Sequence, residues 1–120
     1  MNTLCKIREI SRAIAEFEQR FEQKYHLSMN EGVLLCCLAR QGELSSGEIA
    51  EVLRLTCSNT SKVIRSVENK GFVTRKLGED DKRQMYFSLT PQGRAELDRL
   101  QPCNIALPEL LTRFLKEEQM

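Results

Sequence analysis

The sequence predicts a mainly α-helical fold that carries one small β-hairpin. Apolar residues recur at spacings of three and four over most of the 120-residue chain, as they do along one face of an α-helix. Side chains that cap helix starts stand directly before these segments. Only residues 72–77 and 83–89 have strand-like composition, and the polar segment Gly-Glu-Asp-Asp-Lys between them is typical of a hairpin turn.

Length and composition are those of an ordinary globular domain. The chain is 41% hydrophobic and 29% charged, and none of its apolar runs approaches the ~20 residues needed to cross a bilayer. Residues 1–10 mix Lys6, Arg8 and Glu9 among apolar residues, a pattern that differs from a secretory signal peptide. We therefore expect one cytoplasmic domain.

The first predicted helix covers residues 3–24 and carries a heptad-like apolar stripe. Its members are Ile7, Ile10, Ile14, Phe17 and Phe21. The stripe fits a helix that packs on its own domain, and it also fits a helix that packs against a second subunit. We favour the second subunit, for a reason that comes from the resemblance below.

Capping motifs predict the next three helices. Ser28 and Glu31 form one capping box, before a helix 29–40 that is expected to bury Val33, Leu34, Cys37 and Leu38. Ser45 and Glu48 form a second box, before a short helix with Ile49, Ala50 and Leu53. Thr56 is the expected cap of helix 57–70, which ends at Gly71.

The remaining elements complete a winged helix-turn-helix. Thr90-Pro91 has the form of a helix start, Pro102 breaks that helix, and Pro108 can open a last one. The last helix would place Leu110, Leu111, Phe114 and Leu115 on one face. Two helices joined by a tight turn and followed by a hairpin define the winged helix-turn-helix.

Helix 57–70 has one apolar side and one side that suits DNA. At 100° per residue, Thr60, Val63, Ile64 and Val67 face inward. The outward residues are Ser58, Lys62, Arg65 and Asn69, flanked by Asn59, Ser61 and Ser66. This outward face has hydrogen-bonding and cationic groups without an acid, as expected of a helix that enters the major groove. A plain solvated face is the alternative, although such faces usually mix both charge signs.

The hairpin offers a second DNA-binding element. Arg83 stands beside the turn, and the carboxylate of Asp81 is close enough in sequence to orient its guanidinium. An arginine held in this way suits the narrow minor groove, and Lys76 and Lys82 would add phosphate contacts. An ordinary surface salt bridge is an equally good interpretation of the pair. Thr56 can also donate to a phosphate.

The five cysteines and the single histidine carry little functional signal. Without a CxxC pair or an even cysteine count, free thiols are expected. Cys5 would react with oxidants only if its pKa were lowered, so an inert thiol is favoured. Cys57 is expected half-buried at the helix start, where oxidation would disturb DNA binding, whereas Cys36 and Cys37 are expected to pack as small hydrophobes, as is Cys103. His26 has no ligand spacing around it, so we expect no metal. The sequence has no nucleophile–base pair, phosphate-cradling glycine loop or paired carboxylate motif, so we expect no cofactor and no enzyme.

Two segments at the right separation resemble the MarR family. Residues 55–75, LTCSNTSKVIRSVENKGFVTR, look like that family's recognition helix running into its wing. Residues 81–93, DKRQMYFSLTPQG, look like its wing signature, an Asp-x-Arg followed by a strand that ends in Leu-Thr-x-x-Gly. The likeness extends from about Leu27 to Leu100.

The resemblance implies a homodimeric DNA-binding regulator, most often a repressor. The counterparts of Ser58, Asn59, Ser61 and Lys62 approach the major groove in that family, and the counterpart of Arg83 enters the minor groove, braced by that of Asp81. It divides the chain into a DNA-binding lobe, 28–90, and dimerisation helices, 1–27 and 91–120. It also implies a near-palindromic operator and a small phenolic or lipophilic effector, and some relatives sense oxidants. The dimerisation residues would be Ile7, Ile10, Ile14, Phe17, Phe21, Leu107, Leu110, Leu111 and Phe114.

One departure from the family pattern keeps a second hypothesis open. The family usually continues into a further helix beyond the equivalent of residues 115–118, whereas this sequence stops at Met120. The dimer interface is therefore expected to be smaller or differently arranged. Winged helices also serve as protein–protein modules, and such a module without DNA binding is the alternative function.

Overall fold

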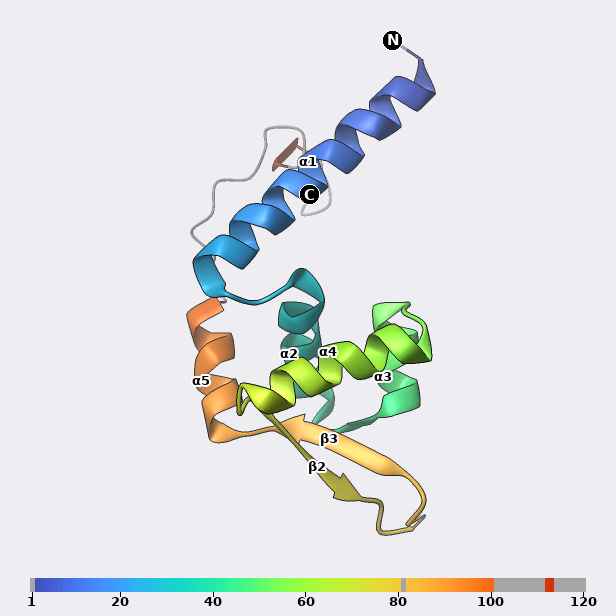
Figure 1. The fold of residues 1–120 in the computed structure, drawn as a ribbon, viewed down its shortest axis with the longest axis vertical. Helices are drawn as coiled ribbons and strands as arrows, with labels where there is room; N and C mark the ends of the chain where they lie inside the picture. Colours follow the sequence, from blue (N-terminus) through green and yellow to red (C-terminus); the bar gives the residue numbers. More distant parts are fainter. Residues whose placement is uncertain (1, 81, 101–111, 114–120) are drawn as a thin grey trace. The chain divides into compact units, whose positions relative to one another are not determined.

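The computed structural model describes residues 2–80, 82–100 and 112–113. Its helices and its hairpin follow the predicted order as far as Leu100 (Figure 1). They are α1 (Thr3–Tyr25), α2 (Met29–Gln41), β1 (Leu44–Ser45), α3 (Ser46–Leu53), α4 (Cys57–Asn69), β2 (Val73–Leu77), β3 (Met85–Leu89) and α5 (Pro91–Leu100). The predicted class, mainly α with a small β-hairpin wing, is confirmed. Residues 29–103 form one compact unit, and α1 belongs to another.

Helix α2 is the centre of the unit that begins at Met29. It contacts α3, α4, α5 and β3, and the core lies where these elements meet. The best-buried core side chains, each at most 1% exposed, are Leu34, Leu35, Leu38, Ile49 and Val67. Burying a side chain of this kind stabilises the fold by roughly 1.5–3 kcal/mol. The core therefore fixes α3 and α4 against α2 in one arrangement.

The predicted starts of α3 and α5 are confirmed by their caps. The Ser45 hydroxyl accepts from the Glu48 N–H at 3.2 Å, and the Ser45 N–H donates to the Glu48 carboxylate at 2.8 Å, which completes the capping box. The Thr90 hydroxyl accepts from the Gly93 N–H at 3.0 Å in the first turn of α5. Gly71 follows α4 with φ of +82°, a backbone conformation that favours glycine.

The sheet contains one strand that the sequence did not predict. β1 pairs antiparallel with β3, and β3 pairs antiparallel with β2, so the strand order is β1-β3-β2. Leu44 lies opposite Phe87 in the first pair. A strand of two residues is too short to show alternation in the sequence. The wing is thus joined along β3 to the segment that leads into α3.

Two predictions of burial on α2 were wrong. Val33 is 40% exposed and Cys36 is also exposed, whereas Leu35 is fully buried and Cys37 is buried as predicted. The reason is that α2 is covered by four elements, so its buried arc is wider than an amphipathic stripe and is centred on Leu34, Leu35 and Leu38. Val33 points away from that arc.

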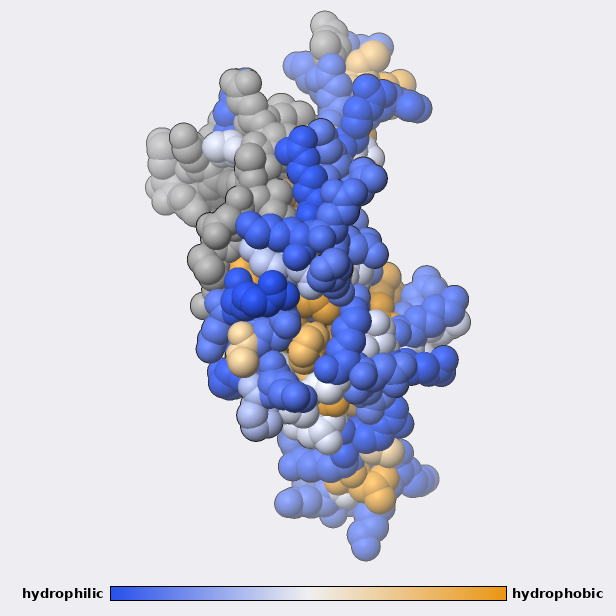
Figure 2. Space-filling model, turned by 60° about the vertical axis from the view of Figure 1, so that its left-hand side comes forward, coloured by the Kyte–Doolittle hydropathy of each residue, from blue (hydrophilic) through white to orange (hydrophobic). Residues whose placement is uncertain are grey.

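The apolar stripe of α1 is exposed in the N-terminal half of the helix and buried near its C-terminal end. Ile7, Ile10 and Ile14 are 55%, 41% and 42% exposed, whereas Phe21 is 7% exposed and its ring lies 5.0 Å from that of Tyr25, centroid to centroid. Figure 2 shows apolar atoms at the surface near the N-terminal end of this helix. Among the described residues, no helix is both long and apolar enough to span a membrane.

Helix α5 packs against α2 and β3 in the same unit as the wing. The segment 91–120, predicted to contain dimerisation helices, begins with this helix. Its predicted dimerisation residues Leu107, Leu110, Leu111 and Phe114 lie outside the described residues, as does Cys103. Their role stays a prediction.

Candidate nucleic-acid interface

Thr56 sets the start of α4 in the way the sequence predicted. Its hydroxyl accepts from the Asn59 N–H at 3.1 Å, and its carbonyl accepts from the Thr60 hydroxyl at 2.7 Å. Thr60 is 1% exposed, so this second bond satisfies a polar group inside the core. The start of the helix is therefore fixed both by a cap and by its own first turn.

The side of α4 predicted to face DNA is exposed along its whole length. Ile64 and Val67, on the opposite side, are 4% and 0% exposed, so apolar packing decides which way the helix faces. The exposed residues are Ser58, Asn59, Ser61, Lys62, Arg65 and Asn69. The structure thus brings the predicted groove residues onto one surface, which no part of the core covers.

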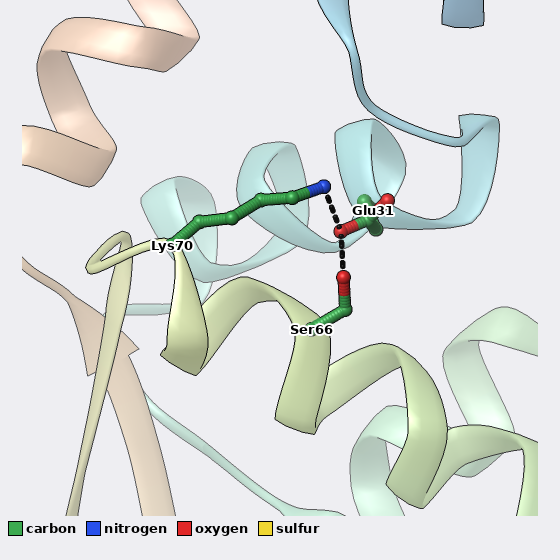
Figure 3. Close-up of polar contacts among 3 residues, drawn as sticks. All are labelled: Glu31, Ser66 and Lys70. Atoms are coloured by element: carbon green, nitrogen blue, oxygen red, sulfur yellow. Dashed lines mark hydrogen bonds and ion pairs between the residues drawn. The ribbon is translucent and has the colours of Figure 1, made fainter.

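One flank of α4 is tied to α2 through a buried carboxylate. Glu31 is 6% exposed, and one of its oxygens accepts from the Ser66 hydroxyl at 2.7 Å and from the Lys70 ammonium at 2.9 Å (Figure 3). The sequence had indicated only a helix-capping role for Glu31. The sequence does show two polar residues four positions apart, Ser66 and Lys70, on one side of the helix. That spacing alone could not identify Glu31, 35 residues before Ser66, as their partner.

The other flank of α4 is tied to the wing. Glu68 is bound by the guanidinium of Arg75 on β2, with Arg75 Nε donating to a carboxylate oxygen at 2.6 Å and a second contact from the terminal nitrogen. The same guanidinium lies over the Phe87 ring of β3, 5.4 Å from its centroid. The hydrogen bond that Arg75 donates to Glu68 raises the pKa of Arg75 above its ordinary value. The sequence analysis had given Arg75 no separate role.

The predicted phosphate contacts of the wing differ in their surroundings. Lys76 is paired with Glu43 at 3.0 Å, and the hydrogen bond to that carboxylate raises the pKa of Lys76. Lys82 and Arg83 are exposed beside the hairpin turn. Asp81, the predicted brace for Arg83, lies outside the described residues. Lys76 would have to exchange a carboxylate for a phosphate, so it is the weakest of these candidates.

Four free thiols lie among the described residues, three of them exposed. Cys5 is exposed in the first turn of α1, where its N–H donates to the Asn2 side chain at 2.9 Å. Cys57 is exposed at the first position of α4, not half-buried as predicted, because the core contacts of this helix begin one turn later at Thr60. Partial burial raises the pKa of Cys36, next to Cys37.

No cluster of three or more His, Cys, Asp or Glu side chains that could hold a metal occurs in the part of the chain that the structure describes. The chemistry of the α4 surface is instead that of hydroxyl, amide, ammonium and guanidinium groups. Such groups donate hydrogen bonds to base edges and phosphates.

Both the sequence and the fold of this chain are similar to those of known transcriptional regulators. The model of the MarR family matches residues 27–85. An HTH-type transcriptional regulator of Bacillus subtilis, YwaE, is 27% identical over 113 residues, which are 93% of this chain and 66% of YwaE. The chain therefore spans just under two thirds of that relative.

Two solved structures share the fold. AbsC of Streptomyces coelicolor, described as a MarR family transcriptional regulator, superimposes with a TM-score of 0.74 at 21% identity, over 98% of this chain and 90% of AbsC. MepR of Staphylococcus aureus, in its complex with DNA, superimposes with a TM-score of 0.72 at 21% identity, over 99% of this chain and 81% of MepR. Residues 27–85 therefore match the MarR family, and the chain has the winged-helix fold of a MarR family regulator.

Proposed function

We propose that the protein is a transcriptional regulator that binds duplex DNA by placing α4 in the major groove. The observation that carries this is the composition of one exposed surface. Between Ser58 and Asn69 the outward side of α4 has amide, hydroxyl and cationic groups and no carboxylate, while its inward side is buried. Glu68, the nearest acid, is occupied by Arg75. The MepR structure is a complex with DNA, which supports the proposal by likeness of fold.

Position along α4 suggests which residues read bases. Ser58, Asn59, Ser61 and Lys62 lie in the first half of the helix, the part that enters deepest in helix-turn-helix complexes. Arg65, one turn later, is assigned to a phosphate, and Thr56 at the cap donates to another. These assignments follow from geometry and from the family resemblance together.

The wing supplies the second set of contacts. Arg83 is proposed to enter the minor groove, where the negative potential is strongest when the groove is narrow. Asp81 would orient it, Lys82 would contact the phosphate backbone, and Lys76 would do so after leaving Glu43.

We propose a homodimer that binds a near-palindromic operator. The three exposed isoleucines of α1 form an apolar surface of the kind that a second copy would cover. A two-fold dimer presents two α4 helices, which matches a site with two similar halves. A repressor role, release by a small phenolic or lipophilic effector, and oxidation at Cys5 or Cys57 are further expectations from the family.

Selection of genomic fragments tests the proposal. Purified protein is mixed with random genomic duplexes, the retained pool is sequenced, and the experiment is repeated with Arg83→Ala. We expect a near-palindromic sequence to be enriched, with a sharp loss of binding in the variant. A folded protein that enriches no sequence at low salt would refute DNA recognition and leave the protein–protein module as the function to test.

A further inference from the structure

The buried carboxylate of Glu31 stands apart from the DNA-facing surface, yet both contacts described above come from α4. A buried ionised group is costly unless it is paired and hydrogen-bonded. Ser66 and Lys70 provide that pairing, and their four-residue spacing places them on one side of the helix. The contact therefore constrains the second half of α4, from Ser66 to its C-cap at Lys70.

The contacts of α4 lie on two opposite flanks of the helix, so they oppose its rotation about its own axis. At roughly 100° per residue, the side that holds Ser66 and Lys70 and the side that holds Glu68 each lie roughly 90° from the centre of the outward face. Glu31 of α2 holds the first side, and Arg75 of the wing holds the second. Apolar packing holds the inward side. Rotation of α4 about its own axis is thus opposed from both flanks.

Small rotations matter at such a surface. With side chains, a helix has a radius of roughly 5–6 Å, so a roll of about 10° displaces side-chain ends by about 1 Å. Binding constellations need to be held to within about 0.5 Å of their working geometry. Apolar contacts are not directional and tolerate a slide of this size better than a short hydrogen bond does.

We infer that Glu31 is a positioning residue for sequence recognition: through Ser66 and Lys70 it fixes the roll of α4 and so the register of Ser58, Asn59 and Lys62 on the base edges. This inference rests on the proposed DNA-binding function. It assigns Lys70 to Glu31 and not to a phosphate, although Lys70 is a cation next to the recognition surface. It also predicts that losing Glu31 weakens discrimination between sequences more than it weakens general attraction to DNA.

The test compares Glu31→Gln with Glu96→Gln. Glu96 is bound by Arg99 on α5, so its variant makes the same charge change in the same unit without touching α4. Affinity is measured for the selected operator and for a scrambled duplex at several salt concentrations. We expect Glu31→Gln to reduce the operator-to-scrambled affinity ratio about tenfold, the size of one lost base contact, with the salt dependence unchanged. Glu96→Gln is expected to keep the wild-type ratio.

Further variants separate positioning from other roles. Ser66→Ala removes one hydrogen bond and leaves the ion pair between Lys70 and Glu31, so it is expected to lower the operator-to-scrambled affinity ratio about threefold. If thermal unfolding shows that Glu31→Gln is not folded at the assay temperature, the Ser66→Ala result decides whether the contact positions α4. Lys70→Met is expected to lower the ratio without changing the salt slope. A slope that falls by about 0.9 in Lys70→Met would mean that Lys70 binds a phosphate, and this would overturn the inference.

The failures can be told apart. A wild-type protein that shows no preference for any duplex refutes the proposed function, and the positioning role with it. A wild-type protein that prefers its operator, together with a folded Glu31→Gln protein of equal preference, refutes the positioning role alone.

Discussion

Helices α1 and α4 carry apolar stripes of the same helical spacing, but the two stripes end in different environments. On α4, Ile64 and Val67 are 4% and 0% exposed, whereas Ile7 and Ile10 of α1 are 55% and 41% exposed. The spacing alone predicts an amphipathic helix in both cases. What covers the apolar side depends on the rest of the fold, and in α4 that cover comes from its own unit.

The difference has a functional meaning. Because the apolar side of α4 is satisfied within its unit, its polar side is free to serve as a binding surface. The N-terminal half of α1 is the reverse case, because its apolar side is exposed to solvent while its polar side is an ordinary solvated surface. In the proposed function, the polar side of α4 recognises DNA and the apolar side of α1 packs against a second subunit.

Matched truncations at Ile64 and Ile10 give the largest expected contrast. Ile64→Ala removes buried methyl groups and leaves a cavity, so we expect a loss of about 2–5 kcal/mol in the free energy of unfolding. Ile10→Ala, at a half-exposed site, is expected to cost less than about 1 kcal/mol of monomer stability. Urea unfolding measures both, and equal losses would mean that the two stripes are not in different environments.

A charge in the α1 stripe should separate the subunits. Ile7→Glu places a carboxylate in the proposed interface twice, once in each copy, so we expect dimer dissociation to become at least about a hundredfold easier, or ~2.7 kcal/mol. Gln19→Glu, on the polar side of α1, is the matched control and should leave the dimer intact. Sedimentation velocity over a range of concentrations checks this. Wild-type protein that stays monomeric throughout would contradict the homodimer.

The sequence predicted the helices and the wing because local chemistry specifies them. Ser45, Thr56 and Gly71 act within one turn of their own position, and the inward side of α4 follows from helical periodicity. The contacts that hold α4 were not predictable in the same way. Glu31 and Ser66 are joined across 35 residues, and Val33 was misplaced because four neighbouring elements, not one, decide which side of α2 is buried.

Loss of the link between Glu68 and the wing should have a smaller effect. Arg75 is about half exposed, so its pair with Glu68 is screened by solvent and is expected to contribute less than about 1 kcal/mol. Glu68→Gln should therefore lower the unfolding free energy slightly, with the difference shrinking as salt is added. A loss above 2 kcal/mol, measured by urea unfolding, would show that the wing depends on this pair.

The smallest expected effect concerns Cys36. Cys36 is exposed, but partial burial raises the pKa of its thiol, so less thiolate is present near neutral pH in the folded protein than in the unfolded chain. Alkylation of Cys36, followed by mass spectrometry of its peptide, should be slower in the folded protein, and the pH at which it accelerates should be higher than in denaturant. Faster alkylation of the folded protein would contradict the direction of the shift.

The central claim is that the outward side of α4 binds DNA, and its salt dependence tests this most directly. Affinity for duplex DNA is measured against salt for wild type, Arg65→Ala and the control Arg94→Ala, whose exposed side chain lies on α5. We predict a slope reduced by about 0.9 in Arg65→Ala, as expected for one lost phosphate contact, and an unchanged slope in Arg94→Ala. Equal slopes in all three proteins would contradict the account, because α4 would then not face the phosphates.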